Sequence, residues 1–145
     1  AYLTALASPD SSTRDYGAQR YGEALAEWLP TFLDDQIKLN DFGGSEYIIA
    51  NLAKGGWTAT LWNARGELYR TRGNQRDLVH AVQFYSNAIA LDDSLAIAHR
   101  GLGLSLFKTG ERTRGQQALA RYLELAPDSD DAKMIQMMLP QETPL

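Results

Sequence analysis

Apolar residues recur every three or four positions over most of the chain, and this spacing predicts amphipathic α-helices. The first such stretch begins near Thr13. Its apolar positions are Tyr16, Tyr21, Leu25, Trp28, Leu29, Phe32, Leu33 and Ile37, of which Trp28 and Phe32 are expected in the core. Pro30 lies inside this pattern, and because proline lacks an amide donor we expect a kink, or a break and restart, near Leu29.

Polar residues and glycines predict where the next helix begins and ends. Asn40 and Asp41 can cap a helix that runs to about Lys54 and ends at two glycines. Gly43 and Gly44 are expected to be close-contact positions at its start. A phosphate-binding loop would need a following Gly-Lys-Ser/Thr, which this sequence lacks there.

The rest of the chain predicts five more helices and no strand. They are expected at residues 58–71, from a cap at Asp77 to residue 90, from a cap at Asp93 or Ser94 to residue 109, at residues 113–125, and from Asp128 onwards with Met134, Ile135, Met138 and Leu139 apolar. Gly73, Gly110 and Pro127 are expected to end helices, and Pro140 and Pro144 predict a frayed tail. Asp128 and Asp131 would place two carboxylates at the positive end of the last helix.

Two of these segments repeat one another. Residues 62–73 and 99–110 share a pattern, and their central glycines, Gly66 and Gly103, are 37 residues apart. A repeat of this length predicts stacked helical hairpins. Glycine at Gly66 and Gly103, and small residues at Ala81 and Gly115, would let the two helices of each hairpin approach closely.

These residues resemble the tetratricopeptide repeat, a helix–turn–helix of 34 residues. The first copy matches at Trp62, Gly66, Tyr69, Gly73, Ala81, Tyr85 and Ala88 if three residues are inserted after Gly73; the second matches at Leu102, Gly103, Leu106, Gly110, Leu119 and Pro127. Arg65, Asp93 and Tyr122 depart from the pattern, which has leucine, proline and alanine there.

The resemblance implies an all-α domain of tetratricopeptide-repeat hairpins that spans the whole chain. It is clear over residues 59–139 and weaker over residues 26–58, where Leu29, Leu33, Phe42, Ser45, Ile49 and Leu52 fall on repeat positions. The expected parts are a degenerate hairpin at residues 13–57, repeats at residues 58–95 and 96–129, and a capping helix at residues 130–139.

A narrower resemblance is to the C-terminal repeat region of bacterial zinc peptidases that carry an HExxH motif. It is based on residues 65–73, 98–104 and 121–128. The catalytic motif is absent, so this resemblance implies an accessory domain of a larger protein in the bacterial periplasm or cell envelope. The chain begins at Ala1 without methionine, which suits a processed form or an excised domain.

Charge and composition narrow the classes of partner. Residues 1–57 contain eight acids and four bases, residues 58–126 six acids and nine bases, and residues 127–145 four acids and one base. With a formal charge of −4, non-specific nucleic-acid binding is not expected, although a local basic groove stays open. No apolar run is long enough to span a bilayer, and no signal peptide opens the chain. Zero cysteines exclude disulfides and thiolate sites.

No catalytic or metal-binding arrangement is found, so no enzyme activity and no cofactor are expected in this chain. His80 and His99 are the only histidines, and neither has the spacing of a metal motif. His80 is expected on a helix surface and His99 at a large-residue position of its repeat. The pairs Asp34-Asp35 and Asp92-Asp93 are adjacent in sequence, so their carboxylates should point apart, and structural roles are favoured.

The resemblance to tetratricopeptide repeats implies a concave face that binds a peptide or protein segment. Its residues would be Asn63, Glu67 and Arg70 in one repeat and Arg100, Leu104 and Lys108 in the next, with Asp34 and Lys38 in the degenerate hairpin. The clamp for C-terminal carboxylates is incomplete here, but Arg70, Arg100 and Lys108 could hold an acidic peptide. A solvated charged face is the plainer interpretation.

Two alternatives remain open for the partner. The chain could be the regulatory or substrate-docking part of an attached peptidase, with its groove filled by another part of that polypeptide. It could also self-associate through Met134, Met137 and Met138, although such residues more often cover the preceding repeat.

Overall fold

The computed structural model describes residues 10–38 and 41–140 of the chain. In these ranges all regular secondary structure is helical and no strand is present, which confirms the predicted all-α class. The helices are α2 (Ser11–Lys38), α3 (Phe42–Leu52), the 3-10 helix η1 (Ala53–Gly55), α4 (Ala59–Arg72), α5 (Gln75–Leu91), α6 (Ala96–Lys108), α7 (Arg112–Leu125) and α8 (Ala132–Met137). The frayed tail expected after Pro140 and the Asn40 part of the α3 cap lie outside the described residues.

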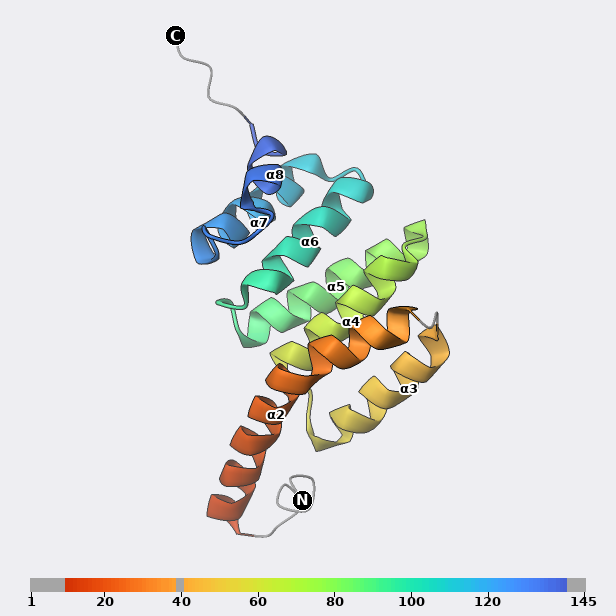
Figure 1. The fold of residues 1–145 in the computed structure, drawn as a ribbon, viewed down its shortest axis with the longest axis vertical. Helices are drawn as coiled ribbons and strands as arrows, with labels where there is room; N and C mark the ends of the chain where they lie inside the picture. The colour runs from red at the N-terminus through yellow and green to blue at the C-terminus, as the bar shows by residue number, and fades with distance from the viewer. Residues whose placement is uncertain (1–9, 39–40, 141–145) are drawn as a thin grey trace.

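Helix α2 is continuous through Pro30, so the predicted break and restart near Leu29 is wrong. Figure 1 shows instead that α2 bends in its middle, which agrees with the kink that was predicted as the other outcome. Its second half crosses α4, and its first half projects beyond the other helices. Tyr21, Leu25 and Leu29 are its buried apolar residues, whereas Trp28 is 47% exposed and not in the core as predicted.

The predicted helix starts are partly correct. Asp41 caps α3, because its Oδ1 accepts a hydrogen bond from the amide of Gly44 at 2.9 Å. Gly44 is a close-contact position, since a Cβ there would overlap the Asp41 carboxylate. The same expectation is wrong for Gly43, where a Cβ would meet no atom within 4 Å. Thr58 caps α4 through a bond from the amide of Leu61 at 3.1 Å.

Other caps differ from the prediction. Helix α5 is capped by Asn74, whose Oδ1 accepts from the amide of Asp77 at 2.9 Å, so Asp77 lies in the first turn. Helix α6 starts after Leu95 without a side-chain cap, so the predicted cap at Asp93 or Ser94 is wrong. The amide and hydroxyl of Ser94 donate to Asp92 Oδ1.

The prediction of two carboxylates at the start of the last helix is correct for Asp131 and wrong for Asp128. Helix α8 begins at Ala132, so Asp128 lies outside it. Asp131 occupies the N-cap position but makes no capping hydrogen bond. Its carboxylate binds Arg100 and Tyr122 instead. Asp131 is therefore held by side chains of α6 and α7 and not by the amides of α8.

Glycines set the close packing of α4 with α5 and of α6 with α7. A Cβ at Gly66 would lie 2.8 Å from the ring of Tyr85, and one at Gly103 would lie 2.6 Å from Leu119. The Tyr85 ring also faces Gly101 on α6, where a Cβ would overlap it. Side chains at these positions would push the helices apart, so the glycines allow α4, α5 and α6 to share one buried tyrosine.

Three apolar clusters follow one another along the chain. The first joins α2 and α3 to α4, the second joins α4 and α5 to α6, and the third joins α6 and α7 to α8. Their buried residues are Tyr21, Leu25, Leu29, Ile49, Leu61, Ala64 and Leu68; Ala81, Tyr85, Ala88 and Ala98; and Leu119, Tyr122 and Ile135. Each helix from α4 onwards therefore packs mainly on its neighbours in the chain (Figure 1).

Candidate functional site

The three predicted site residues of α4 lie at the centre of the molecule. Asn63 is only 6% exposed, and its Oδ1 is buried without a hydrogen-bond partner in the structure. Glu67 and Arg70 are partly buried one and two turns further along the helix. Because a buried amide oxygen normally has a partner, Asn63 carries an unused acceptor at this point of the fold.

Glu67 and Arg70 form a closed hydrogen-bond network with Tyr85 of α5. The Tyr85 hydroxyl donates to Glu67 Oε1 at 2.7 Å and accepts from Arg70 Nε at 3.0 Å. Arg70 Nη2 donates to Glu67 Oε2 at 2.8 Å. Burial, together with the Glu67 carboxylate, raises the pKa of Tyr85 well above its usual value, so its hydroxyl remains a donor.

Arg100 of α6 forms a second network, which ties α6 and α7 to α8. Its Nε donates to Asp131 Oδ2 at 2.5 Å, and the Tyr122 hydroxyl donates to Asp131 Oδ1 at 2.5 Å. Burial alone would raise the pKa of Asp131, but the hydrogen bonds from Tyr122 and Arg100 outweigh it and hold that pKa below its usual value. Both arginines predicted to bind an acidic ligand are therefore already paired with a carboxylate of the chain.

The other two predicted residues of α6 differ in their surroundings. Leu104 is partly buried and packs against the cluster of Leu119, Tyr122 and Ile135. Lys108 is exposed and forms no ion pair among the described residues. Among the cations predicted for this face, Lys108 is thus the one that is not paired with a carboxylate of the described residues.

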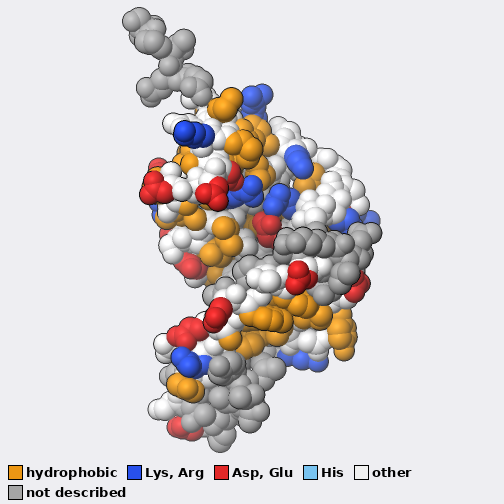
Figure 2. All heavy atoms as spheres, in the orientation of Figure 1, with side chains coloured by type: hydrophobic (Ala, Val, Ile, Leu, Met, Phe, Trp, Pro, Cys, Tyr) orange, Lys and Arg blue, Asp and Glu red, His pale blue; other side chains and the backbone are white. Residues whose placement is uncertain are grey.

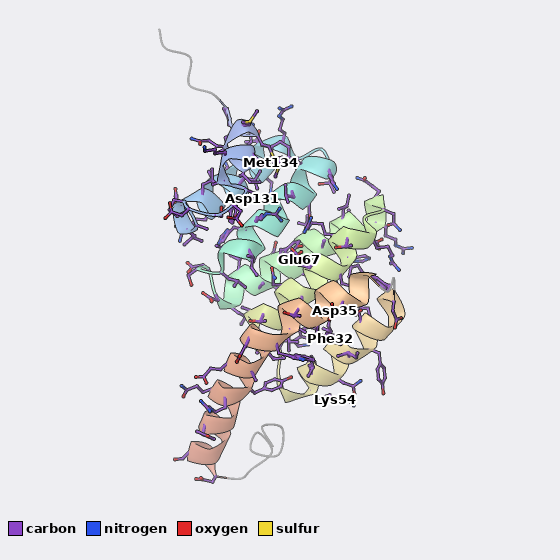
Figure 3. The ribbon with its side chains drawn as sticks, viewed as in Figure 1. Phe32, Asp35, Lys54, Glu67, Asp131 and Met134 are labelled. Carbon is purple, nitrogen blue, oxygen red and sulfur yellow. The ribbon has the colours of Figure 1, made fainter. Side chains whose placement is uncertain are left out.

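The view with side chains shows how these acidic groups are arranged. In Figure 3, Asp35, Glu67 and Asp131 follow one another from α2 across α4 towards α8. Over α4 and α6, Figure 2 shows Lys or Arg side chains next to Asp or Glu side chains. The side chains of Asp34 and Lys38, which were expected on the same face, lie outside the described part of the structure.

The two histidines have different surroundings. His99 is buried, and its Nε2 lies 2.8 Å from the Asp93 carbonyl oxygen. His80 is exposed and lies against the rings of Tyr69 and Phe84, with centroids 5.8 Å and 6.2 Å away. Within residues 10–38 and 41–140, no three His, Asp or Glu side chains come together as a metal site would require.

An aromatic cluster with an arginine at its centre was not predicted. Arg65 lies over the Phe84 ring, 4.3 Å from its centroid, and its Nε donates to both Glu46 oxygens at 3.2 Å. Nearby, Trp57 stacks on Trp62 with centroids 3.8 Å apart. The signal in the sequence was Arg65 itself, which stands where the repeat pattern has leucine. Arg65, on α4, thus contacts α3 through its salt bridge with Glu46 and α5 through its cation–π contact with Phe84.

Two apolar surfaces remain open to solvent. Trp28 stacks on Phe32 with centroids 4.9 Å apart and stays half-exposed. Figure 2 shows hydrophobic side chains gathered between α2 and α3. At the other end, Met134 and Met137 are exposed, whereas Ile135 is fully buried under them.

Comparison with known proteins gives no family for this chain: no protein-family model matches the sequence, and no curated protein is significantly similar to it. In the part of the chain that the structure describes, no helix is both long enough and apolar enough to cross a membrane.

Proposed function

We propose that this chain is a non-catalytic binding module that holds a peptide or protein segment on the face formed by α4 and α6. The observation that carries the proposal is the buried Oδ1 of Asn63, which lacks a hydrogen-bond partner. Leaving such an acceptor unpaired costs roughly 1–3 kcal/mol. The Asn63 side chain is 6% exposed, and an N–H group of a bound segment would satisfy the oxygen once the amide turns it towards the face.

We also assign α4–α5 and α6–α7 to two hairpins of tetratricopeptide type, with α8 as the cap. The support is the similar placement of Gly66 against Tyr85 and of Gly103 against Leu119. Tyr85 follows Gly66 by 19 positions and Leu119 follows Gly103 by 16, a difference that equals the three residues inserted after Gly73. Equivalent contacts at equivalent positions are what a structural repeat requires.

The charges on the face favour one mode of binding. Arg70 is held by Glu67 and the Tyr85 hydroxyl, and Arg100 is held by Asp131, so an acidic ligand would have to displace Glu67 or Asp131. Lys108 has no such partner among the described residues. We therefore assign Asn63 to a main-chain N–H of the ligand and Lys108 to an acidic side chain or carboxylate.

The test is selection of a phage-displayed peptide library on the purified chain, followed by titration of the enriched peptides. Asn63→Ala and Lys108→Glu should each weaken binding about tenfold, because each removes one hydrogen bond or ion pair worth about 1.4 kcal/mol. Lys54→Glu is the matched control, because Lys54 is exposed on η1 and away from α4 and α6. Peptides that bind all three variants as well as the parent would show that this face is not the site.

A second candidate function is that of an accessory domain in a zinc peptidase of the bacterial envelope. The half-exposed stack of Trp28 on Phe32 favours it, since such a surface between α2 and α3 suits contact with another folded domain. The coding sequence upstream of Ala1 tests it. An in-frame HExxH helix would support this candidate, and an unrelated domain would contradict it.

A further inference from the structure

The helix connections of the α4–α8 region lie on two opposite edges. The turns from α4 to α5 and from α6 to α7 are on one edge, and those from α5 to α6 and from α7 to α8 are on the other (Figure 1). This follows from antiparallel neighbours of similar length. Side chains near alternate turns are therefore brought together, although they are far apart in sequence.

The first edge is basic. Arg76 lies just after the α4–α5 turn, and Lys108 and Arg112 flank the α6–α7 turn. All three are exposed and form no ion pair among the described residues. We call these three residues the basic edge.

The remaining charges near these turns cancel in pairs. Arg72 binds Asp77 at 2.7 Å, and Arg114 binds Glu111 at 3.0 Å. The net charge of this side of the molecule is therefore that of the basic edge.

The opposite edge is acidic. Asp92 and Asp93 lie at the α5–α6 connection, and Asp128 and Asp130 at the α7–α8 connection. All four are exposed and make no ion pair within the described ranges. We call them the acidic edge. Figure 2 shows acidic side chains along the left side of the molecule, beside α7 and the connection to α8.

The two edges are opposite in charge, and along each edge the charge recurs in the next pair of helices. Arg112 follows Arg76 by 36 positions, and Asp128 follows Asp92 by 36 positions. Each edge thus repeats its charge once per pair of helices.

We infer that copies of this chain associate side by side, with the basic edge of one copy against the acidic edge of the next. A second copy suits the basic edge because it presents an edge of opposite charge on its own α4–α8 region, formed by Asp92, Asp93, Asp128 and Asp130. The two surfaces differ, so the contact is heterologous and leaves one edge of each sign free. A concentration-dependent series of oligomers is therefore expected rather than one closed dimer.

Ionic strength provides the first test. Sedimentation velocity over a range of protein concentrations is measured in about 0.01 M and about 0.15 M sodium chloride, where the screening length falls from about 30 Å to about 8 Å. The apparent dissociation constant should rise about tenfold at the higher salt, as expected for a few exposed ion pairs. A chain that sediments as a monomer at low salt overturns the inference.

Charge exchange provides the second test. Arg76→Glu with Arg112→Glu reverses the basic edge, and Asp93→Lys with Asp128→Lys reverses the acidic edge. Lys108 is left unchanged because it belongs to the proposed peptide face, and Asp92 because it holds Ser94. Each double variant alone should remain monomeric at low salt, and an equimolar mixture of the two should associate again.

A control with the same change in net charge completes the experiment. Arg20→Glu with Lys54→Glu places the new acids on α2 and η1, both outside the basic edge. This variant, checked for folding by circular dichroism like the others, should associate as the parent does. Loss of association in this control, or failure of the mixture to associate, overturns the inference.

Discussion

At the scale of single residues, three buried side-chain oxygens among the described residues lack a hydrogen-bond partner, those of Asn63, Ser105 and Ser129, and the first two have different consequences. Asn63 belongs to the polar face of α4, next to Glu67 and Arg70. Ser105 is fully buried among the packed helices around α6. Both oxygens are enclosed, but the Asn63 side chain is 6% exposed and can turn its amide towards a ligand, whereas Ser105 has no exposed surface and its unpaired hydroxyl only lowers stability.

Ser105→Ala should therefore raise the free energy of unfolding by about 1 kcal/mol, because it removes a buried hydroxyl that has no partner. Urea denaturation followed by circular dichroism measures the change. Ser86→Ala is the control, because the Ser86 hydroxyl donates to the Val82 carbonyl oxygen at 2.7 Å and its loss should give no gain. A Ser105→Ala chain that is less stable than the parent would contradict the prediction.

Asp77 makes stability depend on pH. Hydrogen bonds from Arg72, at 2.8 Å and 2.7 Å, hold the pKa of Asp77 below its usual value. The pKa in the folded chain is thus lower than the unfolded value of about 3.9, so the contribution of Asp77 is present above that pH. It is lost as the pH falls through the folded pKa.

The measurement is the urea midpoint of the parent and of Asp77→Asn between about pH 6 and pH 2. The parent should be the more stable chain at pH 6, and the difference should shrink below about pH 4. Asp130→Asn, an exposed acid with no ion pair in the described structure, should follow the parent throughout. A difference between parent and Asp77→Asn that stays constant with pH would rule out the Arg72 contact as its cause.

At the scale of helices, the packing depends on a few positions without a side chain. Gly101→Ala should lower the free energy of unfolding by about 1–3 kcal/mol, because its Cβ would overlap the buried Tyr85 ring. Gly43→Ala is the matched change, since nothing lies within 4 Å and alanine favours the helix by up to about 1 kcal/mol. The thermal unfolding midpoints of the two variants are the measurement. Equal midpoints for Gly101→Ala and Gly43→Ala would show that the Tyr85 ring can move aside.

Helix type and number could be predicted from periodicity, but several ends could not. Asp77 and Asn74 are both good caps three residues apart, and only the contact of Asp77 with Arg72 leaves the cap to Asn74. Similarly, Pro30 can break or bend a helix, and packing of Leu25 and Leu29 on α4 keeps α2 continuous. Local propensities cannot rank such choices, because the deciding contact lies across a turn for Asp77 and on another helix for α2.

The candidate site shows the same limit. Helical spacing places Asn63, Glu67 and Arg70 near one another, and the structure has them adjacent on α4. Their partners are not local: Tyr85 is 18 residues from Glu67, and Asp131 is 31 residues from Arg100. The pairing that neutralises both arginines therefore required the tertiary structure, as did the finding that Asn63 is buried.

At the scale of the whole molecule, the three apolar clusters form a row, and its two ends are held differently. At the C-terminal end, α8 is fixed by buried Ile135 and by the Asp131 contacts with Arg100 and Tyr122. At the other end, α2 contributes Tyr21, Leu25 and Leu29 to the first cluster, and its first half projects (Figure 1). The Tyr21 hydroxyl also donates to the Leu52 carbonyl oxygen, which links α2 to the end of α3.

Hydrogen exchange should therefore be fastest in the first half of α2 and slowest in α4 and α5, which are packed on both sides. Tyr21→Phe removes the bond to Leu52 and should speed exchange in α2 and α3 further, while leaving α6 and α7 unchanged. Tyr122→Phe is the counterpart at the other end, where exchange in α8 should increase instead. Mass spectrometry of peptides from each helix measures both effects. Uniform exchange across α2, α4 and α5, or a Tyr21→Phe effect that reaches α7, would mean that the helices open together and that the row of clusters behaves as a single cooperative unit.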